Sequence, residues 1–135
     1  MIFAEIRIKA HFYHLDPLNI VWHGNYAEFL EQARCELLDK IDYGYNKMAE
    51  SGYIWPVVDM RIKYVRPISF QQEVVVRATL KEYETRLKID YLITDATTGE
   101  RLTKAHTIQV AVEAETGEMC FESPKVLQEK VGRLT

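Results

Sequence analysis

The residues of this sequence that are best suited to chemistry lie in one stretch, His11–Leu38, which reads HFYHLDPLNIVWHGNYAEFLEQARCELL. Asp16 stands in a turn, because the following proline biases it away from the helical conformation, and Asn19 tolerates the left-handed conformation of a tight reversal. His23-Gly24-Asn25 then leads into an amphipathic segment. A carboxylate is ionised at neutral pH and can serve as a nucleophile or general base, while the free amides at a helix start stabilise negative charge on an oxygen. We interpret this carboxylate on a rigid turn, followed by a helix start, as the candidate site.

The helix that provides this start is predicted over residues 25–40. Asn25 is a favoured N-cap, and Glu28 three residues later completes the pattern of a capping box. The apolar residues that follow recur at steps of three and four, which is typical of one buried helix stripe. They are Tyr26, Phe29, Leu30, Ala33, Leu37 and Leu38.

Length and composition predict a single domain over residues 1–135, since 47% of the 135 residues are hydrophobic. A net charge of -3 with both signs interspersed does not favour nucleic-acid binding. No apolar run approaches the ~20 residues of a membrane span, and the first residues do not resemble a secretory signal. We therefore expect a cytoplasmic protein in which Cys35 and Cys120 are reduced.

The other elements follow from hydrophobic periodicity. A clean alternation over residues 2–13 predicts a half-buried strand before the turn. Downstream, a short helix is predicted over 45–51, strands around 58–64, 74–80, 87–93 and 102–112, and a final helix over 124–131, with His106 on the apolar side of the last strand. One strand, one long helix and then four or more antiparallel strands predict an α+β fold with the helix on one face of a curved sheet. One helix cannot cover both faces and both edges of such a sheet, so we expect an oligomer.

The run D-P-L-N-I-V-W-H-G-N-Y, with E-x-A-R at Glu31 to Arg34, resembles the 4-hydroxybenzoyl-CoA thioesterase group of the hotdog fold. It also resembles the acyl-CoA thioesterases of the tol-pal gene cluster type. The segment Tyr64–Pro67 fits the same pattern, and the resemblance covers essentially the whole chain. One departure is Leu18-Asn19, where the family usually has glycine in the turn.

The resemblance implies a hotdog fold, in which a curved antiparallel sheet wraps around one long central helix, and an enzyme that hydrolyses acyl-CoA thioesters. It implies that Asp16 attacks the thioester or activates water, and that backbone N–H groups at the start of the central helix polarise the carbonyl. It also implies a homodimer with sites across the interface, assembled as a dimer of dimers in homotetrameric members, and neither a cofactor nor a metal.

The individual site residues each have a plainer interpretation. Asp16 alone would fit a turn residue whose side chain accepts a hydrogen bond from the backbone two residues on. His23 is assigned a catalytic role through its backbone N–H, with its ring as a pocket wall or a capping neighbour as alternatives. Tyr26 fits the helix core first and a substrate pocket second. Asp59 is a reserve candidate for positioning water, although a solvated strand-face carboxylate is commoner.

A CoA substrate carries phosphates, so a cationic patch is expected near the site. Arg86 and Lys88 share one strand face in a region where the family has basic residues, and Arg61, Lys63 and Arg66 are the alternative set. Asp16 with His11, His14 and His23 offers groups that zinc accepts. Strand alternation would place His11 and His14 on opposite faces, so we expect no metal site.

Two other functions remain open. One is a non-catalytic module that binds acyl-CoA or an acyl carrier, in which Asp16 is only a turn residue. The other is a hotdog dehydratase, although the sequence around His23 does not match the histidine pattern of that group.

Overall fold

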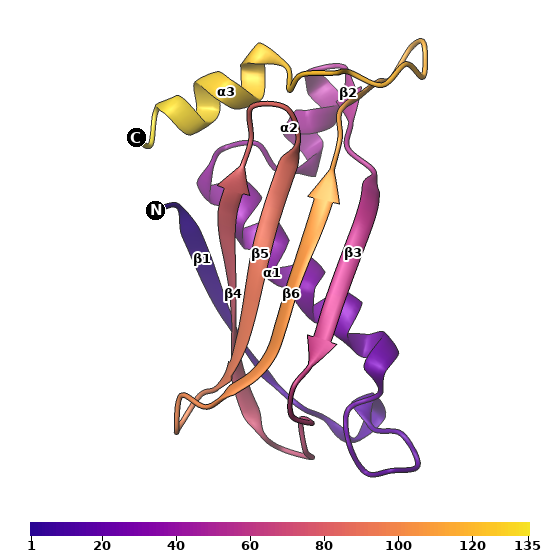
Figure 1. Cartoon of the computed structure of the whole chain (residues 1–135), viewed down its shortest axis with the longest axis vertical. Coiled ribbons are helices and arrows are strands. Elements are labelled where there is room, and N and C mark those ends of the chain that lie inside the picture. The colour runs from indigo at the N-terminus through magenta and orange to yellow at the C-terminus, as the bar shows by residue number, and fades with distance from the viewer.

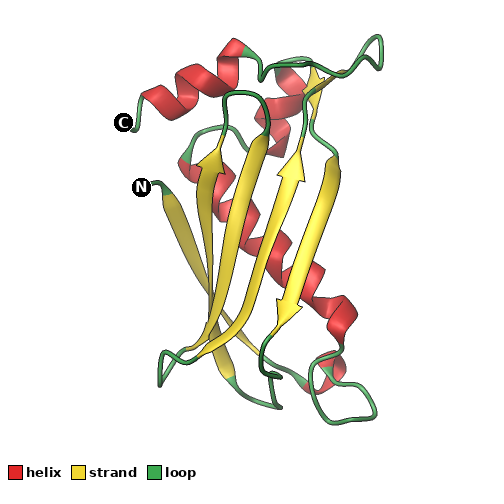
Figure 2. Ribbon diagram, in the orientation of Figure 1, coloured by secondary structure: helices red, strands yellow, loops and turns green.

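The computed structural model describes all of residues 1–135 and shows a five-stranded antiparallel sheet with one long helix across one face (Figures 1 and 2). The strand order is β1-β4-β5-β6-β3, and a separate two-stranded sheet pairs β2 with β7. The strands are β1 (Phe3–Lys9), β2 (Tyr53–Ile54), β3 (Val57–Tyr64), β4 (Glu73–Glu82), β5 (Leu87–Asp95), β6 (Arg101–Gln109) and β7 (Val112–Glu113). The helices are α1 (Tyr26–Lys40), α2 (Tyr45–Glu50) and α3 (Lys125–Gly132), with 3-10 turns η1 (Phe12–His14) and η2 (His23–Asn25). This is the α+β hotdog arrangement that the sequence predicts.

The core lies between α1 and the sheet. Every apolar residue of the predicted helix stripe is buried, and α1 packs against β1 and β4. Alternate residues of β4 and β5 meet the helix from the sheet side, among them Val76 and Ile89, both 0% exposed. The helix therefore forms because its apolar stripe and the alternating strands bury one another. No helix in the structure has both the length and the apolar character needed to cross a membrane.

The strand β3 lies at one edge of the sheet, paired with β6 rather than with the next strand along the chain, β4. The chain crosses over so that β4 pairs with β1 away from the β3 edge, and these two strands make the main contacts of the sheet with α1. Val58, Met60 and Tyr64 on β3 consequently remain about half exposed, at 57%, 47% and 45%. An unpaired edge that carries exposed apolar side chains is the kind of surface that a partner covers.

The first strand is shorter than predicted. The alternation over residues 2–13 suggests a strand through Phe12, but β1 ends at Lys9 and the chain turns into η1. Phe12 is 77% exposed there, whereas Ala10 is buried. His11 and His14 are therefore not strand residues on opposite faces, and their ring centroids lie 5.7 Å apart.

The face assignment of the last long strand is wrong for most of its length. A register shift in the β5–β6 ladder between Ile93 and Thr94 buries both Leu102 and Thr103, so the alternation slips by one residue. Beyond this bulge, Thr103 and Thr107 face α1, and His106 faces away from it rather than into the core. The extra residue of a bulge reverses the face of every later side chain, and the apolar pattern of residues 102–112 does not reveal it.

Polar side chains are buried on the helix side of β6 because they form a network with α1. Arg34 is 6% exposed and donates hydrogen bonds to the hydroxyls of Tyr45 (2.9 Å) and Tyr91 (3.2 Å). The Tyr91 hydroxyl also lies 2.7 Å from Thr107 Oγ1. The predicted pairing of Arg34 with Glu31 is present at 3.6 Å, but the buried tyrosines are the closer partners.

Candidate active site

The turn that carries Asp16 is closed by its own backbone. The Asp16 N–H donates to the Ile20 carbonyl at 3.0 Å, and Leu15 pairs with Val21 as an isolated antiparallel bridge. Asn19 adopts φ 63°, which confirms that asparagine takes the left-handed position where the family usually has glycine. The turn therefore survives the departure from the family pattern.

The Asp16 carboxylate is half-buried, and one of its oxygens is already occupied. Oδ1 accepts a hydrogen bond from the Leu18 N–H at 2.8 Å, which is the bond that a purely structural turn aspartate makes. Oδ2 accepts no hydrogen bond from the chain, and no cation lies within ion-pair distance. The turn thus fixes the side chain through one oxygen and leaves the second available for chemistry.

The helical segment after the turn begins earlier than predicted, in the 3-10 turn η2. Trp22 is the N-cap residue of η2, with extended backbone angles (φ -60°, ψ 134°), and α1 continues from Tyr26. The backbone N–H groups of His23 and Gly24 donate no hydrogen bond within the chain. Two free amides at the start of a helical segment can bind an oxygen that carries negative charge.

Asn25 occupies the N-cap position of α1, as the sequence predicts, but its side chain makes no capping hydrogen bond and no capping box forms with Glu28. Asn25 has helical backbone angles, its side chain caps nothing, and its Nδ2 donates instead to the His14 carbonyl at 2.8 Å. A side chain that could cap the helix is thus used to fasten the helix start to the turn before it.

Replacing Asn25 distinguishes a role in capping the helix from a role in binding the His14 carbonyl. We expect Asn25→Ala to lower the free energy of unfolding by about 1 kcal/mol, because one hydrogen bond to a backbone carbonyl is lost. Aspartate is a good N-cap, but it cannot donate a hydrogen bond to the His14 carbonyl. Asn25→Asp should therefore lower the free energy of unfolding by at least as much. Urea unfolding of the three proteins measures both values, and an Asn25→Asp variant as stable as wild type would restore the capping role.

His14 connects the turn to the helix from the other side. Its carbonyl also accepts the Trp22 N–H at 2.9 Å, and its Nδ1 accepts the His11 N–H at 2.9 Å. The ring packs edge-on against Phe29 of α1 with 5.1 Å between centroids, and burial lowers the pKa of the imidazole. The neutral His14 ring extends from η1 and packs against α1, so it holds the Asp16 turn in one position relative to the helix start.

Tyr64, at the end of β3, fixes the helix start to the sheet. Its hydroxyl donates to the His23 carbonyl at 2.9 Å, and its ring meets Tyr26 edge-on at 4.7 Å. The bond joins residues 41 apart in sequence, so no local pattern indicates it, although Tyr64 lies in the family segment Tyr64–Pro67. Tyr26 itself is only 2% exposed and burial raises its pKa, which makes it a core side chain in the single chain.

Removing the Tyr64 hydroxyl is expected to make η2, which carries the free amides, less firmly fixed without exposing the core. Tyr64→Phe keeps the ring contact with Tyr26 and loses one hydrogen bond, so we expect about 1 kcal/mol of lost stability. We expect kcat to fall more than the affinity for substrate, because a displaced donor weakens transition-state contacts most. Steady-state kinetics beside thermal unfolding test this, and an unchanged kcat in a destabilised variant would limit Tyr64 to a structural role.

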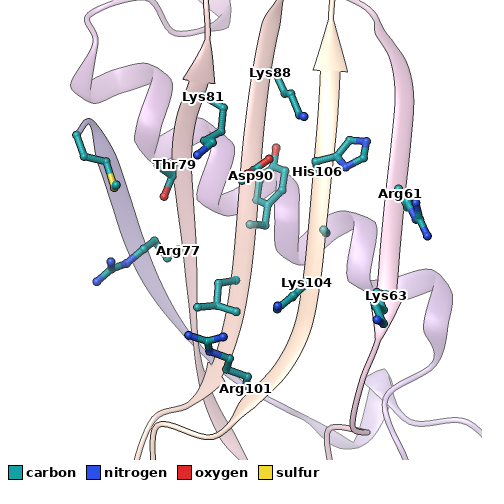
Figure 3. A pocket seen from close by; sticks show the side chains of 14 residues that line it. Arg61, Lys63, Arg77, Thr79, Lys81, Lys88, Asp90, Arg101, Lys104 and His106 are labelled. Atoms are coloured by element: carbon teal, nitrogen blue, oxygen red, sulfur yellow. The ribbon is translucent and has the colours of Figure 1, made fainter.

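The remaining predicted site residues lie elsewhere in the single chain. Asp59 is exposed on β3, 3.8 Å from His106 Nε2. Arg86 donates twice to the Glu82 carboxylate, at 2.8 and 3.1 Å, and its pKa is raised by that partner. Lys88 lies on the sheet face away from α1 (Figure 3). The structure brings His23 to the Asp16 turn but does not bring these three there within one chain, and their substrate contacts stay predictions.

Comparison with known proteins identifies the family of the chain. The family description that matches is the Thioesterase-like superfamily, over residues 10–131. A Synechocystis protein that carries the name of an esterase is 30% identical over 131 residues, which are 96% of this chain and 79% of that protein. The long-chain acyl-CoA thioesterase FadM of Escherichia coli is 31% identical over 78 residues, 58% of each chain.

Solved structures share the fold of the chain. A DHNA-CoA thioesterase from Staphylococcus aureus superposes with a TM-score of 0.86 and 26% identity, covering 99% of this chain and 91% of that one. A 4-hydroxybenzoyl-CoA thioesterase superposes with a TM-score of 0.83 over 96% of this chain and 99% of its own, at 19% identity, which is a likeness of fold. Because the family match spans most of the sequence, the chain belongs to the Thioesterase-like superfamily and is a thioester hydrolase of the hotdog fold.

Proposed function

We propose that this protein hydrolyses acyl-CoA thioesters, with Asp16 as nucleophile or general base and the start of the central helical segment as oxyanion site. The observation that carries the proposal is the arrangement of the turn: a half-buried carboxylate with one free oxygen, fastened through His14 to a helix start with two free amides. The names of the relatives support the substrate class, since they include acyl-CoA and DHNA-CoA thioesterases.

The chemistry requires only these groups and water. The thioester carbonyl oxygen would accept the N–H groups of His23 and Gly24, which stabilise the negative charge that develops as the carbonyl is attacked. Asp16 Oδ2 would either attack the carbonyl carbon, forming an anhydride that water then cleaves, or take a proton from the attacking water. In both routes the carbon–sulfur bond breaks, and the products are a carboxylic acid and the CoA thiol.

The comparison with the 4-hydroxybenzoyl-CoA thioesterase supports the role of the carboxylate. That protein was solved in complex with 4-hydroxybenzoyl-CoA as a variant in which an aspartate is replaced by asparagine. We carry this to Asp16 as a proposal, because Asp16 lies in the motif shared with that group. Asparagine keeps the shape of the side chain and removes its charge, so the same exchange tests this chain.

We further propose that the acyl pocket is completed by a second copy of the chain. Around the Asp16 turn four large apolar side chains are exposed: Phe12 and Tyr13 at 77%, Leu18 at 74% and Trp22 at 48%. The half-exposed apolar residues of β3 continue the uncovered surface along the sheet edge. A dimer formed through this surface, and a dimer of dimers built from it, would enclose the acyl group between subunits.

A non-catalytic acyl-CoA-binding module is the second candidate, because the Asp16–Leu18 hydrogen bond is what such a module would also contain. Hydrolysis of a panel of aromatic, short-chain and long-chain acyl-CoAs, followed as release of the free thiol, distinguishes the two. Turnover above the uncatalysed rate on at least one substrate supports the enzyme. Binding of CoA without turnover on any of them would support the module.

A further inference from the structure

The sheet face turned away from α1 carries a cavity of about 580 Å³, which we call the outer groove. Side chains from β3, β4, β5 and β6 line it (Figure 3). Seven of the 17 Lys and Arg residues of the chain line it, but only one of the 20 acidic residues, Asp90. A chain of net charge -3 therefore concentrates positive charge in one hollow.

Most of these cations have no carboxylate partner. Arg77 is paired with Glu5 at 2.8 Å. The other six have no carboxylate oxygen within 4.0 Å, and they are Arg61, Lys63, Lys81, Lys88, Arg101 and Lys104. Elsewhere on the sheet surface the chain does pair its charges, as Arg7 with Glu73 and Arg66 with Glu100 show.

The register of the sheet places two lysines directly opposite one another, Lys63 on β3 and Lys104 on β6. Like charges at directly opposed positions destabilise a sheet, so this pair weakens the fold unless an anion lies between the two side chains. The same repulsion disfavours stacking of two copies through this face.

We propose that the outer groove binds a small molecule that carries two or more phosphate groups. The cations extend over four neighbouring strands, a width of roughly 14 Å, which several phosphates can span and a single carboxylate cannot. Leu92 lies between Arg77 and Lys104 on the same face and offers an apolar surface for a base or sugar. A cavity of this size is typical of small-ligand sites rather than of a protein or nucleic-acid surface.

The groove lies on the face opposite α1, whereas the Asp16 turn precedes the first turn of α1. Two sources share the proposed chemistry: a free nucleotide, or the nucleotide end of an acyl-CoA whose acyl group reaches the site of a neighbouring subunit. The site itself is independent of the proposed hydrolysis.

Titration calorimetry at low ionic strength tests the site with inorganic tripolyphosphate, ADP and coenzyme A as probes. The test variant is Lys63→Glu/Lys104→Glu, and the matched control is Lys9→Glu/Lys125→Glu, which makes the same charge change outside the groove. We expect wild type to bind all three probes at one site per chain, and the groove variant to lose about tenfold or more in affinity. The control should lose much less, and added salt should weaken binding.

The single variant Lys63→Glu controls for a loss of binding that is caused by misfolding. It places a carboxylate opposite Lys104 and should leave Tm unchanged or higher. Failure of wild type to bind any probe would overturn the site, as would equal losses in the groove and control variants. Tighter binding of a DNA duplex than of coenzyme A would overturn it as well.

Two kinetic measurements distinguish a free nucleotide from the nucleotide end of an acyl-CoA substrate. A raised KM for acyl-CoA in the groove variant, with an unchanged KM for the acyl-pantetheine that lacks the nucleotide, identifies the substrate's own nucleotide. Unchanged KM values with weakened ADP binding identify a free nucleotide. Probe binding should persist in Asp16→Asn, so a failed hydrolysis assay leaves this test intact.

Discussion

Asp16→Asn is expected to lower kcat for acyl-CoA hydrolysis by at least about 10²- to 10⁴-fold, the range that one general acid or base contributes. Asparagine keeps an oxygen that can accept the Leu18 N–H, so the turn should persist while the negative charge is lost. The variant therefore changes the chemistry with little change in structure. Thiol release under substrate saturation measures the effect, and thermal unfolding should give a Tm close to that of wild type.

The chain contains a matched control for this substitution. Asp95 also stands in a turn and accepts a backbone N–H two residues on, from Thr97 at 2.8 Å, the same distance as the Asp16–Leu18 bond. Its carboxylate also accepts the Thr98 N–H and the Gln72 amide, and these bonds lower its pKa to about 2. Asp95→Asn removes a turn carboxylate at the end of β5 and should leave kcat unchanged. Equal activity of Asp16→Asn and Asp95→Asn would reduce Asp16 to a turn residue.

The pH dependence of stability also differs between wild type and the control. The pKa of Asp95 is depressed, so its charged form is favoured by folding, and that contribution is present at neutral pH and is lost as pH falls toward 2. Because Asp95 is only partly buried, solvent screens its interactions and the size of this contribution is small. Activity measured near neutral pH is therefore compared under conditions where the Asp95 carboxylate of wild type is charged.

The sequence predicts the parts of this fold that depend on local patterns. Helix α1 and its buried stripe follow from three- and four-residue spacing, and the turn follows from Pro17 and Asn19. The strands follow from alternation with small errors at their ends. These predictions succeed because the residues that determine each feature lie within a few positions of one another in the sequence.

The features that the sequence does not predict depend on contacts between distant residues. The bulge opposite Ile93 reverses the face of β6, and the side chain of Asn25, although at the N-cap position, binds the His14 carbonyl instead of capping the helix. The Tyr64 hydroxyl reaches His23 across the sheet. In each case a local preference is overruled by a partner that only the folded chain supplies.

The same distinction applies to the site. Sequence places a carboxylate before a helix start, but the two free amides belong to a 3-10 turn that precedes the predicted cap. Arg86 and Lys88 carry the positive charge expected of CoA contacts, yet Lys88 belongs to the outer groove and Arg86 is held by Glu82. Charge alone identifies a kind of ligand, whereas position decides which surface binds it.

The backbone role of His23 leads to the second large effect, which is best measured with two substitutions at one position. His23→Pro removes the N–H, and the structure accommodates proline there: His23 is the first residue of η2, where proline is favoured, and Trp22 already has the extended angles that a residue before proline adopts. We expect kcat to fall by about 10²- to 10³-fold, the cost of removing one oxyanion donor. His23→Ala keeps the N–H and removes only an exposed ring, so its kcat should stay within a few-fold of wild type.

The comparison of the two His23 variants distinguishes the role of the backbone N–H from that of the imidazole ring. Circular dichroism and Tm should be nearly the same for both, because the Tyr64 hydroxyl still binds the His23 carbonyl in each. If His23→Ala loses as much activity as His23→Pro, the imidazole ring rather than the amide is the working group. If neither variant loses activity, the helix start is not the oxyanion site, and the negative charge that develops on the carbonyl must be stabilised by groups that a second subunit supplies.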